Sequence, residues 1–206
     1  GIVTEHRSEL VACVESLRAI ASKRASAPAP GSSLPGLTLT YANTLLVAEE
    51  DIPGLQTDLV DYSGRFVWNK ADTARPYCDY ELGSVIDDLR SKPTNPPDTA
   101  PTRLEALERD IARLKTASYI AVTHTESAQS VVVRHTVFDP GSWKGSVAVW
   151  DRAKSAWVGA LAIEVTDGRT HTTSGAIDMS DELTRTLNRH ITRTIEESLH
   201  KGQSIP

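Results

Sequence analysis

The chain of 206 residues is long enough for one sizeable domain, or for a domain with an extra arm. Hydrophobic residues make up 39% and charged residues 24% of it, which is typical of a globular protein with a real core. The net charge is −5, which argues against a nucleic-acid partner, and no apolar run is long enough for a transmembrane segment.

The start of the chain leaves its compartment open. Gly1 stands where a Met is normally found, so a signal peptide, a membrane anchor or a disordered tail upstream has been removed, or the chain starts there naturally. Cys13 and Cys78 predict one disulfide in an oxidising compartment, or two separate thiols in a reducing one. Neither cysteine lies in a CxxC pair, so the sequence does not indicate a zinc or thioredoxin-type site.

The first third of the chain predicts a helix, a linker and strands. Residues 4–23 carry apolar residues at helical spacing. Residues 25–36 read ASAPAPGSSLPG, a composition typical of a linker rather than of a core. Strand candidates follow at 37–50 and 65–69.

The middle of the chain predicts two helices, at 79–91 and 102–117, joined by a proline-rich loop. Thr102 and Glu105 have the spacing of a capping box, in which each side chain binds a free amide at the start of the helix. We therefore expect the second helix to begin at this point.

The period then changes from helical to alternating. Short connections between the next strand candidates predict antiparallel neighbours. A last helix is expected at 180–200, with Ser180 as its cap. The strand candidates are residues 118–125, 130–138, 145–151 and 156–165.

These elements predict an α+β fold, an antiparallel meander of four or more strands with helices packed mainly on one face. We expect three parts in the chain. They are an N-terminal helix or arm at 1–24, the linker at 25–36 and a single α+β domain at 37–202.

The stretch VAVWDRAKSAWVGALAIEV, residues 147–165, predicts a core hairpin that turns at 152–155. Without a bulge, alternation places two sets of side chains on opposite faces. We expect the first set to face the helices at 102–117 and 180–200, and the second to be shallower, with Trp150 near an edge or a ligand groove. The first set is Val147, Val149, Trp157, Leu161, Ile163 and Val165, and the second is Trp150, Val158, Ala160, Ala162 and Glu164.

The histidines do not predict a metal site. With a loop at 126–129, His124 and His135 share a face but lie about 13 Å apart along the sheet. Zinc ligands lie about 2 Å from one ion, so this pair cannot share a metal. We expect no metal and no cofactor.

Two loops are candidates for ligand binding. In FDPGSW, Asp139 has ordinary turn chemistry, and Trp143 is the aromatic that follows it. The polar loop at 167–175 carries His171, which forms a hydrolase triad with Ser174 and Asp167 only if geometry brings the three together. We predict ligand-binding roles for Trp143, Trp150 and His171, and no catalytic residue.

The segments LKTASYIAVTHT and VFDPGSWKGSVAVWDRAKSAWVGAL, with the helix after MSDEL, resemble a loose group of uncharacterised bacterial envelope and lipoprotein-like proteins. The resemblance covers roughly half of the chain. It implies a periplasmic or membrane-anchored location, with a cytoplasmic one as the alternative, and it implies no activity.

The sequence therefore favours a non-enzymatic binding or scaffolding domain of the cell envelope, with an unknown protein or small-molecule partner. The alternative is a small hydrolase-like enzyme, or a small-ligand carrier, that uses the loops at 139–143 and 167–175. A nucleophile and a base within hydrogen-bond reach would favour the enzyme.

Overall fold

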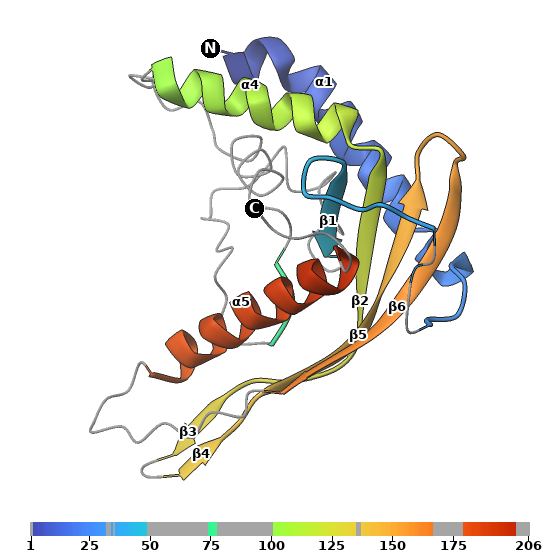
Figure 1. The fold of residues 1–206 in the computed structure, drawn as a ribbon. Coiled ribbons are helices and arrows are strands. Elements are labelled where there is room, and N and C mark those ends of the chain that lie inside the picture. The colour runs from blue at the N-terminus through green and yellow to red at the C-terminus, as the bar shows by residue number, and fades with distance from the viewer. Residues whose placement is uncertain are drawn as a thin grey trace.

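The computed structural model describes residues 2–31, 34, 36–48, 74–77, 101–134, 137–166 and 179–200 (Figure 1). Over these ranges the chain has an α+β fold, with a mixed, mostly antiparallel four-stranded sheet and three α-helices. The helices are α1 (Ile2–Ala21), α4 (Pro101–Thr116) and α5 (Met179–Leu199), with a short 3-10 helix η1 (Arg24–Ser26). The sheet consists of β1 (Thr44–Ala48), β2 (Tyr119–Gln129), β5 (Ser142–Asp151) and β6 (Ala156–Thr166).

The strand order is β1-β2-β5-β6, which differs from the predicted meander. β2 pairs antiparallel with β5, and β5 with β6, but β1 joins the edge of β2 in parallel. A parallel pair needs a long crossover, and the chain between β1 and β2 supplies one. Short connections identify antiparallel neighbours, but they do not reveal a parallel partner that comes from far along the chain.

The second predicted strand, 130–138, is not a strand of the four-stranded sheet but forms a two-stranded sheet of its own. It divides into β3 (Val132–Arg134) and β4 (Val137–Asp139), which pair with each other. The pair Val132–Asp139 lies three residues beyond the last β2–β5 pair, Gln129–Ser142, on both strands, so one long ribbon continues past the sheet.

The loop predicted at 126–129 is therefore wrong, because these residues continue β2. They are all exposed, and an exposed ribbon accepts polar side chains that look like a loop in the sequence.

Helices cover both faces of the sheet, which corrects the prediction that they pack mainly on one face. Leu45 and Val47 of β1 point into a core that includes α1 and α4, whereas Leu46 points to the opposite side. We call the core with α1 and α4 the first core, and the core on the opposite side of the sheet the second core. The first core joins α1 and α4 to the sheet through Val14, Leu17, Ile20, Ile111, Leu114, Ile120, Val122 and Trp150. The second core joins α5 to the sheet through Trp143, Val147, Val149, Leu161, Ile163, Val165, Leu183, Leu187, Ile191 and Ile195.

The predicted linker contributes to the structure. Gly31 pairs in parallel with the outer edge of β6, donating to the carbonyl of Ala160 at 2.8 Å and accepting from the amide of Ala162 at 3.1 Å. Leu34 then packs on the second core, against Gly159. The chain thus passes around the β6 edge from the α1 face to the α5 face, whereas its composition predicted no part in a core.

The core hairpin is confirmed, with β5 and β6 joined by a turn at 152–155. Two face assignments are wrong because the register shifts between Val149 and Trp150. Val158 is the extra residue, so Val158 packs on the second core and Trp157 faces the first core. The expected packing of α4 against the face with Ile163 is also wrong, since α4 lies on the other face.

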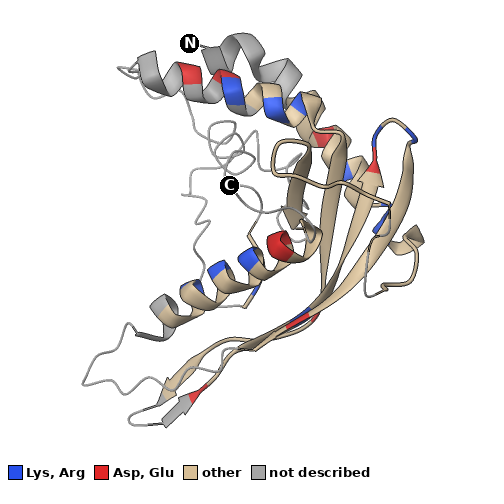
Figure 2. Cartoon of the chain, in the orientation of Figure 1, with Lys and Arg blue, Asp and Glu red and all other residues tan. Residues whose placement is uncertain are grey.

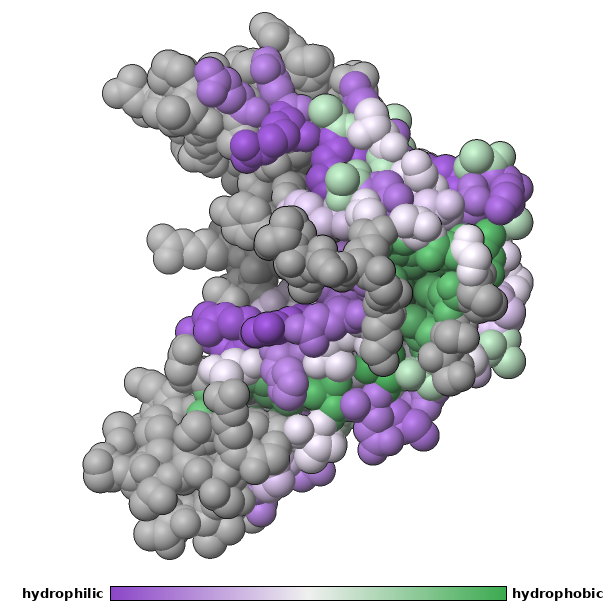
Figure 3. All heavy atoms as spheres, viewed as in Figure 1, coloured by the Kyte–Doolittle hydropathy of each residue, from purple (hydrophilic) through white to green (hydrophobic). Residues whose placement is uncertain are grey.

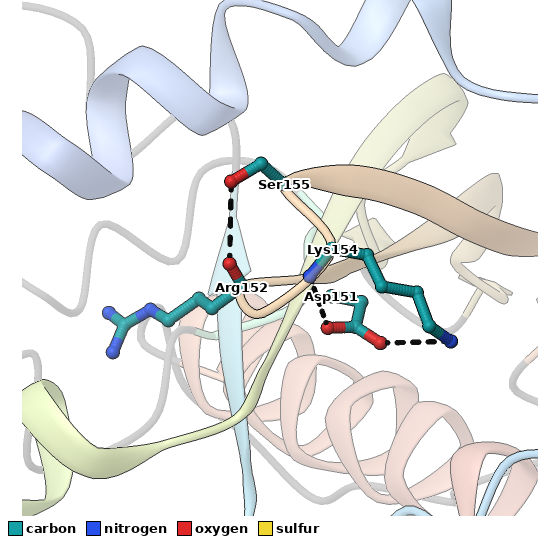
Figure 4. A network of polar contacts seen from close by, with 4 residues as sticks. All are labelled: Asp151, Arg152, Lys154 and Ser155. Carbon is teal, nitrogen blue, oxygen red and sulfur yellow. Dashed lines mark hydrogen bonds and ion pairs between the residues drawn. The ribbon is translucent and has the colours of Figure 1, made fainter.

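The turn itself is held by its own side chains (Figure 4). The Asp151 carboxylate accepts from the amide of Lys154 at 3.0 Å and pairs with the Lys154 ammonium at 3.3 Å. Ser155 takes a left-handed conformation at φ 49°, which closes the four-residue loop. Asp151 and Ser155 thus hold the turn that the sequence predicted at 152–155.

Several predicted elements lie outside the described residues. These include the strand at 65–69, the helix at 79–91 and the loop at 167–175. Among the described helices, none combines the length and the apolar composition that crossing a membrane requires.

Candidate functional site

Trp143 and Trp150 are both buried, in different cores. Trp143 has no exposed surface, and its indole donates to the hydroxyl of Thr125 at 2.9 Å. Trp150 is 8% exposed and meets Trp157 edge to face, with ring centroids 5.1 Å apart. The Lys23 ammonium lies 5.2 Å from the centre of the Trp150 ring. A ligand would reach either indole only by opening packed structure.

The predicted loop at 139–143 is a break between two strands. Asp139 ends β4 and Ser142 begins β5. Between them, Gly141 lies so close to α5 that an added Cβ would be 2.5 Å from a methyl of Leu187. The break therefore lets the ribbon pass directly beneath α5.

The remaining candidate residues from the sequence do not add to a site. His171, His135 and Cys78 lie outside the described residues, so the predicted disulfide with Cys13 stays a prediction. Within the described ranges, no three His, Cys, Asp or Glu side chains are grouped closely enough to hold a metal ion.

One serine and one histidine lie opposite each other on neighbouring strands, on the face of the sheet that carries the first core. Ser146 of β5 lies opposite His124 of β2, and its hydroxyl accepts from the Arg24 guanidinium at 2.6 Å. A guanidinium can only donate, so Arg24 cannot take the serine proton as the general base of a nucleophile must. This contact therefore anchors η1 to the sheet and does not prepare a catalytic serine.

The most unusual polar arrangement lies on α5. Short polar residues follow the buried apolar stripe of the helix, at every fourth position. Thr184 is 1% exposed and Asn188 is fully buried, although such residues are poor helix formers that usually face solvent. We call Thr184, Asn188 and Thr192 the polar row.

The polar row holds a separate piece of main chain, residues 74–77. Asn188 Oδ1 accepts from the amide of Arg75 at 2.8 Å, and Thr192 Oγ1 accepts from the amide of Tyr77 at 2.9 Å. The Thr192 hydroxyl donates its proton to the carbonyl of Asn188 at 2.9 Å, so its oxygen is left as the acceptor. Side chains of one element thus bind the backbone of another.

The spacing of the two elements explains the match. Four residues of an α-helix rise about 6.0 Å, and two residues of an extended chain span about 6.6 Å. Successive members of the polar row therefore meet alternate amides of the segment. Pro76, between them, has no N–H, so no amide donor of residues 75–77 is left without a partner.

The side chains of residues 74–77 alternate between buried and partly buried positions. Ala74 is fully buried in the second core, and Pro76 is buried too. Arg75 and Tyr77 are only partly buried. The site thus binds main chain directly and buries small or rigid side chains at two positions, and Asn188 Nδ2 also donates to the Tyr77 hydroxyl at 3.5 Å.

Sequence reasoning missed this site. Its signal is the repetition of Thr, Asn and Thr directly after Leu183, Leu187 and Ile191. That repetition indicates a second contact surface on α5, but nothing in it identifies residues 74–77 as the occupant.

Comparison with known proteins found no relative of this chain. No protein-family model matches this chain, and neither the curated proteins nor the solved structures contain a match.

Proposed function

We propose that this chain is a non-enzymatic binding or scaffolding domain of the bacterial cell envelope, and that it holds an extended polypeptide segment against α5. The observation that carries the binding role is the pair of hydrogen bonds from the Arg75 and Tyr77 amides to Asn188 and Thr192. The envelope location is supported by the sequence resemblance alone.

The polar row suits peptide binding because it contacts atoms that every extended chain has. Main-chain hydrogen bonds supply affinity, and the buried positions select side chains. In this chain the role is filled in cis by residues 74–77. A tethered segment has an effective concentration in the millimolar range, so a free peptide competes poorly with it.

The test uses full-length chains in which the internal segment has been displaced. Ala74→Glu places a charge in the second core. Tyr77→Pro removes the amide that binds Thr192. We call a chain with either substitution an opened chain. The ligand is a fluorescent peptide of residues 70–80 with Cys78→Ser. Circular dichroism and cooperative unfolding establish that both chains are folded.

We expect saturable binding of this peptide to the opened chains, measured by fluorescence anisotropy, and binding at least about tenfold weaker to the wild-type chain. Adding Asn188→Leu and Thr192→Val should abolish binding. Thr194→Val is the matched control, because its hydroxyl bonds only to the carbonyl of His190 in its own helix. Folded opened chains that bind no peptide would overturn the proposal.

A further inference from the structure

α5 presents different surfaces to solvent and to residues 74–77, which we call the internal segment. Figure 2 shows basic residues recurring along the helix, and Figure 3 shows hydrophilic side chains gathered over it. The internal segment meets other positions of the helix. Asn188 is fully buried, and Leu187 and Ile191 belong to the second core together with Ala74. Selection of a segment therefore takes place in the packed interior and not at the charged surface.

Asn188 contacts two residues of the internal segment with the two ends of one amide group. Its Oδ1 accepts from the amide of Arg75 at 2.8 Å, and its Nδ2 donates to the hydroxyl of Tyr77 at 3.5 Å. The first contact needs only a main-chain amide, which every residue except proline supplies. The second contact needs a side chain with a hydrogen-bond acceptor, so it distinguishes one sequence from another.

Tyr77 is held at both ends by members of the polar row. Its amide donates to Thr192 Oγ1 at 2.9 Å, while its hydroxyl accepts from Asn188. Four residues of a helix rise about 6.0 Å, so a side chain whose main chain binds Thr192 must be long to contact Asn188. Serine and threonine are too short, and phenylalanine has no hydroxyl. Tyrosine covers the distance with two side-chain torsions, which limits the entropy lost on binding.

The two buried positions restrict the segment in size and in flexibility. Ala74 is fully buried in the second core, where a larger side chain would have to displace closely packed neighbours. Pro76 is buried between the two bound amides. Its fixed φ suits an extended chain, so a free peptide with this proline loses less conformational freedom when it binds.

We infer that α5 recognises an extended polypeptide segment with a small residue, a residue that supplies its amide, a proline and a tyrosine in succession. The inference rests on the proposed function, since it concerns the same site and names the class of partner. Asn188 determines the preference for tyrosine. Thr192 binds main chain and contributes affinity without that preference.

The experiment compares peptides on the opened chains by fluorescence anisotropy. The reference peptide covers residues 70–80 with Cys78→Ser. Tyr77→Phe in this peptide removes the hydroxyl that Asn188 contacts, and binding should weaken about fivefold, as expected for the loss of one hydrogen bond. Tyr80→Phe removes the same group from the other tyrosine of the peptide, so it is the matched control and should leave binding unchanged.

Substitutions at the two buried positions test the rest of the pattern. Ala74→Leu in the peptide should weaken binding about tenfold, because the larger side chain overfills the second core. Pro76→Ala should weaken binding about threefold, because the free peptide then has more conformations to lose.

A double-mutant cycle assigns the preference for tyrosine to Asn188. In opened chains with Asn188→Ala, the reference peptide and the Tyr77→Phe peptide should bind with equal affinity. Thr192→Val is the matched control, because it removes the acceptor of a main-chain amide. It should weaken the binding of both peptides and keep the fivefold difference between them.

The outcomes separate the two proposals. Equal binding of the reference and Tyr77→Phe peptides, or an equal loss from Tyr80→Phe, overturns the preference for tyrosine and leaves peptide binding by α5 standing. A preference that survives Asn188→Ala also overturns its assignment to that residue. Undiminished binding of the Ala74→Leu or Pro76→Ala peptide overturns the pattern at that position. Failure of the reference peptide to bind folded opened chains overturns peptide binding itself.

Discussion

Arg152 donates from its guanidinium to the carbonyl oxygen of Leu114 at 2.9 Å, and so joins the β5–β6 turn to the end of α4. The same guanidinium donates to the carbonyls of Lys115 and Ala117, at 2.9 and 3.1 Å. The last carbonyls of a helix have no partners within the helix and carry partial negative charge. Partial burial lowers the pKa of Arg152, but an arginine keeps its proton at neutral pH.

Replacing Arg152 should therefore destabilise the fold. Arg152→Ala leaves two carbonyls of the last turn of α4 and the carbonyl of Ala117 without their charged donor, and we expect a loss of about 2–3 kcal/mol in the free energy of unfolding. Lys154→Ala removes a side chain that is 66% exposed and should change it by less than about 0.5 kcal/mol. Urea unfolding measures both, and equal effects would contradict a capping role.

Asp151 should contribute a pH-dependent part of the stability. Its hydrogen bond from the Lys154 amide lowers the pKa of the carboxyl below its ordinary value. A lowered pKa in the folded state stabilises the protein above the unfolded pKa of about 3.9, and the contribution is lost as the pH falls through the folded pKa.

Asp151→Asn keeps an acceptor oxygen and removes the charge, so it isolates this contribution. The stability difference from wild type should be present at about pH 6 and should shrink below about pH 4. A difference that stays constant over this range would show that the charge has no role.

Ile163 should behave as a core residue and its neighbour Ala162 as a surface residue. Ile163 is 7% exposed in the second core, whereas Ala162 is exposed on the opposite face. Ile163→Ala should cost about 2–5 kcal/mol in equilibrium unfolding, and Ala162→Ser much less. A cost for Ile163→Ala within about 0.5 kcal/mol of zero would contradict the face assignment.

The disulfide between Cys13 and Cys78 stays a prediction. Cys13 is partly buried on α1. A bridge would add about 3–4 kcal/mol in the chain-entropy model. Thiol titration under denaturing, non-reducing conditions should find no free thiol, and two free thiols per chain would exclude the bridge.

Local patterns predicted the elements that carry strong periodicity. The β5–β6 hairpin with its turn, and the helices α4 and α5, follow from alternation and from apolar stripes. The face of Trp157 could not be predicted, because one extra residue, Val158, reverses the alternation at the end of β6.

The remaining differences arise from contacts between distant parts of the chain. The parallel partner of β2 comes from Thr44–Ala48, and the pairing of Gly31 with β6 has no local signal. The candidate site has the same origin, since Asn188 meets Arg75 across a separation of 113 residues. The sequence marks Asn188 as unusual but does not name its partner.

Hydrogen exchange at the amides of Arg75 and Tyr77 is the most direct test of whether α5 holds an extended main chain. Nuclear magnetic resonance can follow both amides in the wild-type chain and in the chain with Asn188→Leu and Thr192→Val. The hydrogen bonds predict slow exchange in the wild type and a loss of that protection in the variant, with the amides of β5 unchanged. Exchange of both wild-type amides at the rate of an unstructured peptide would contradict the account.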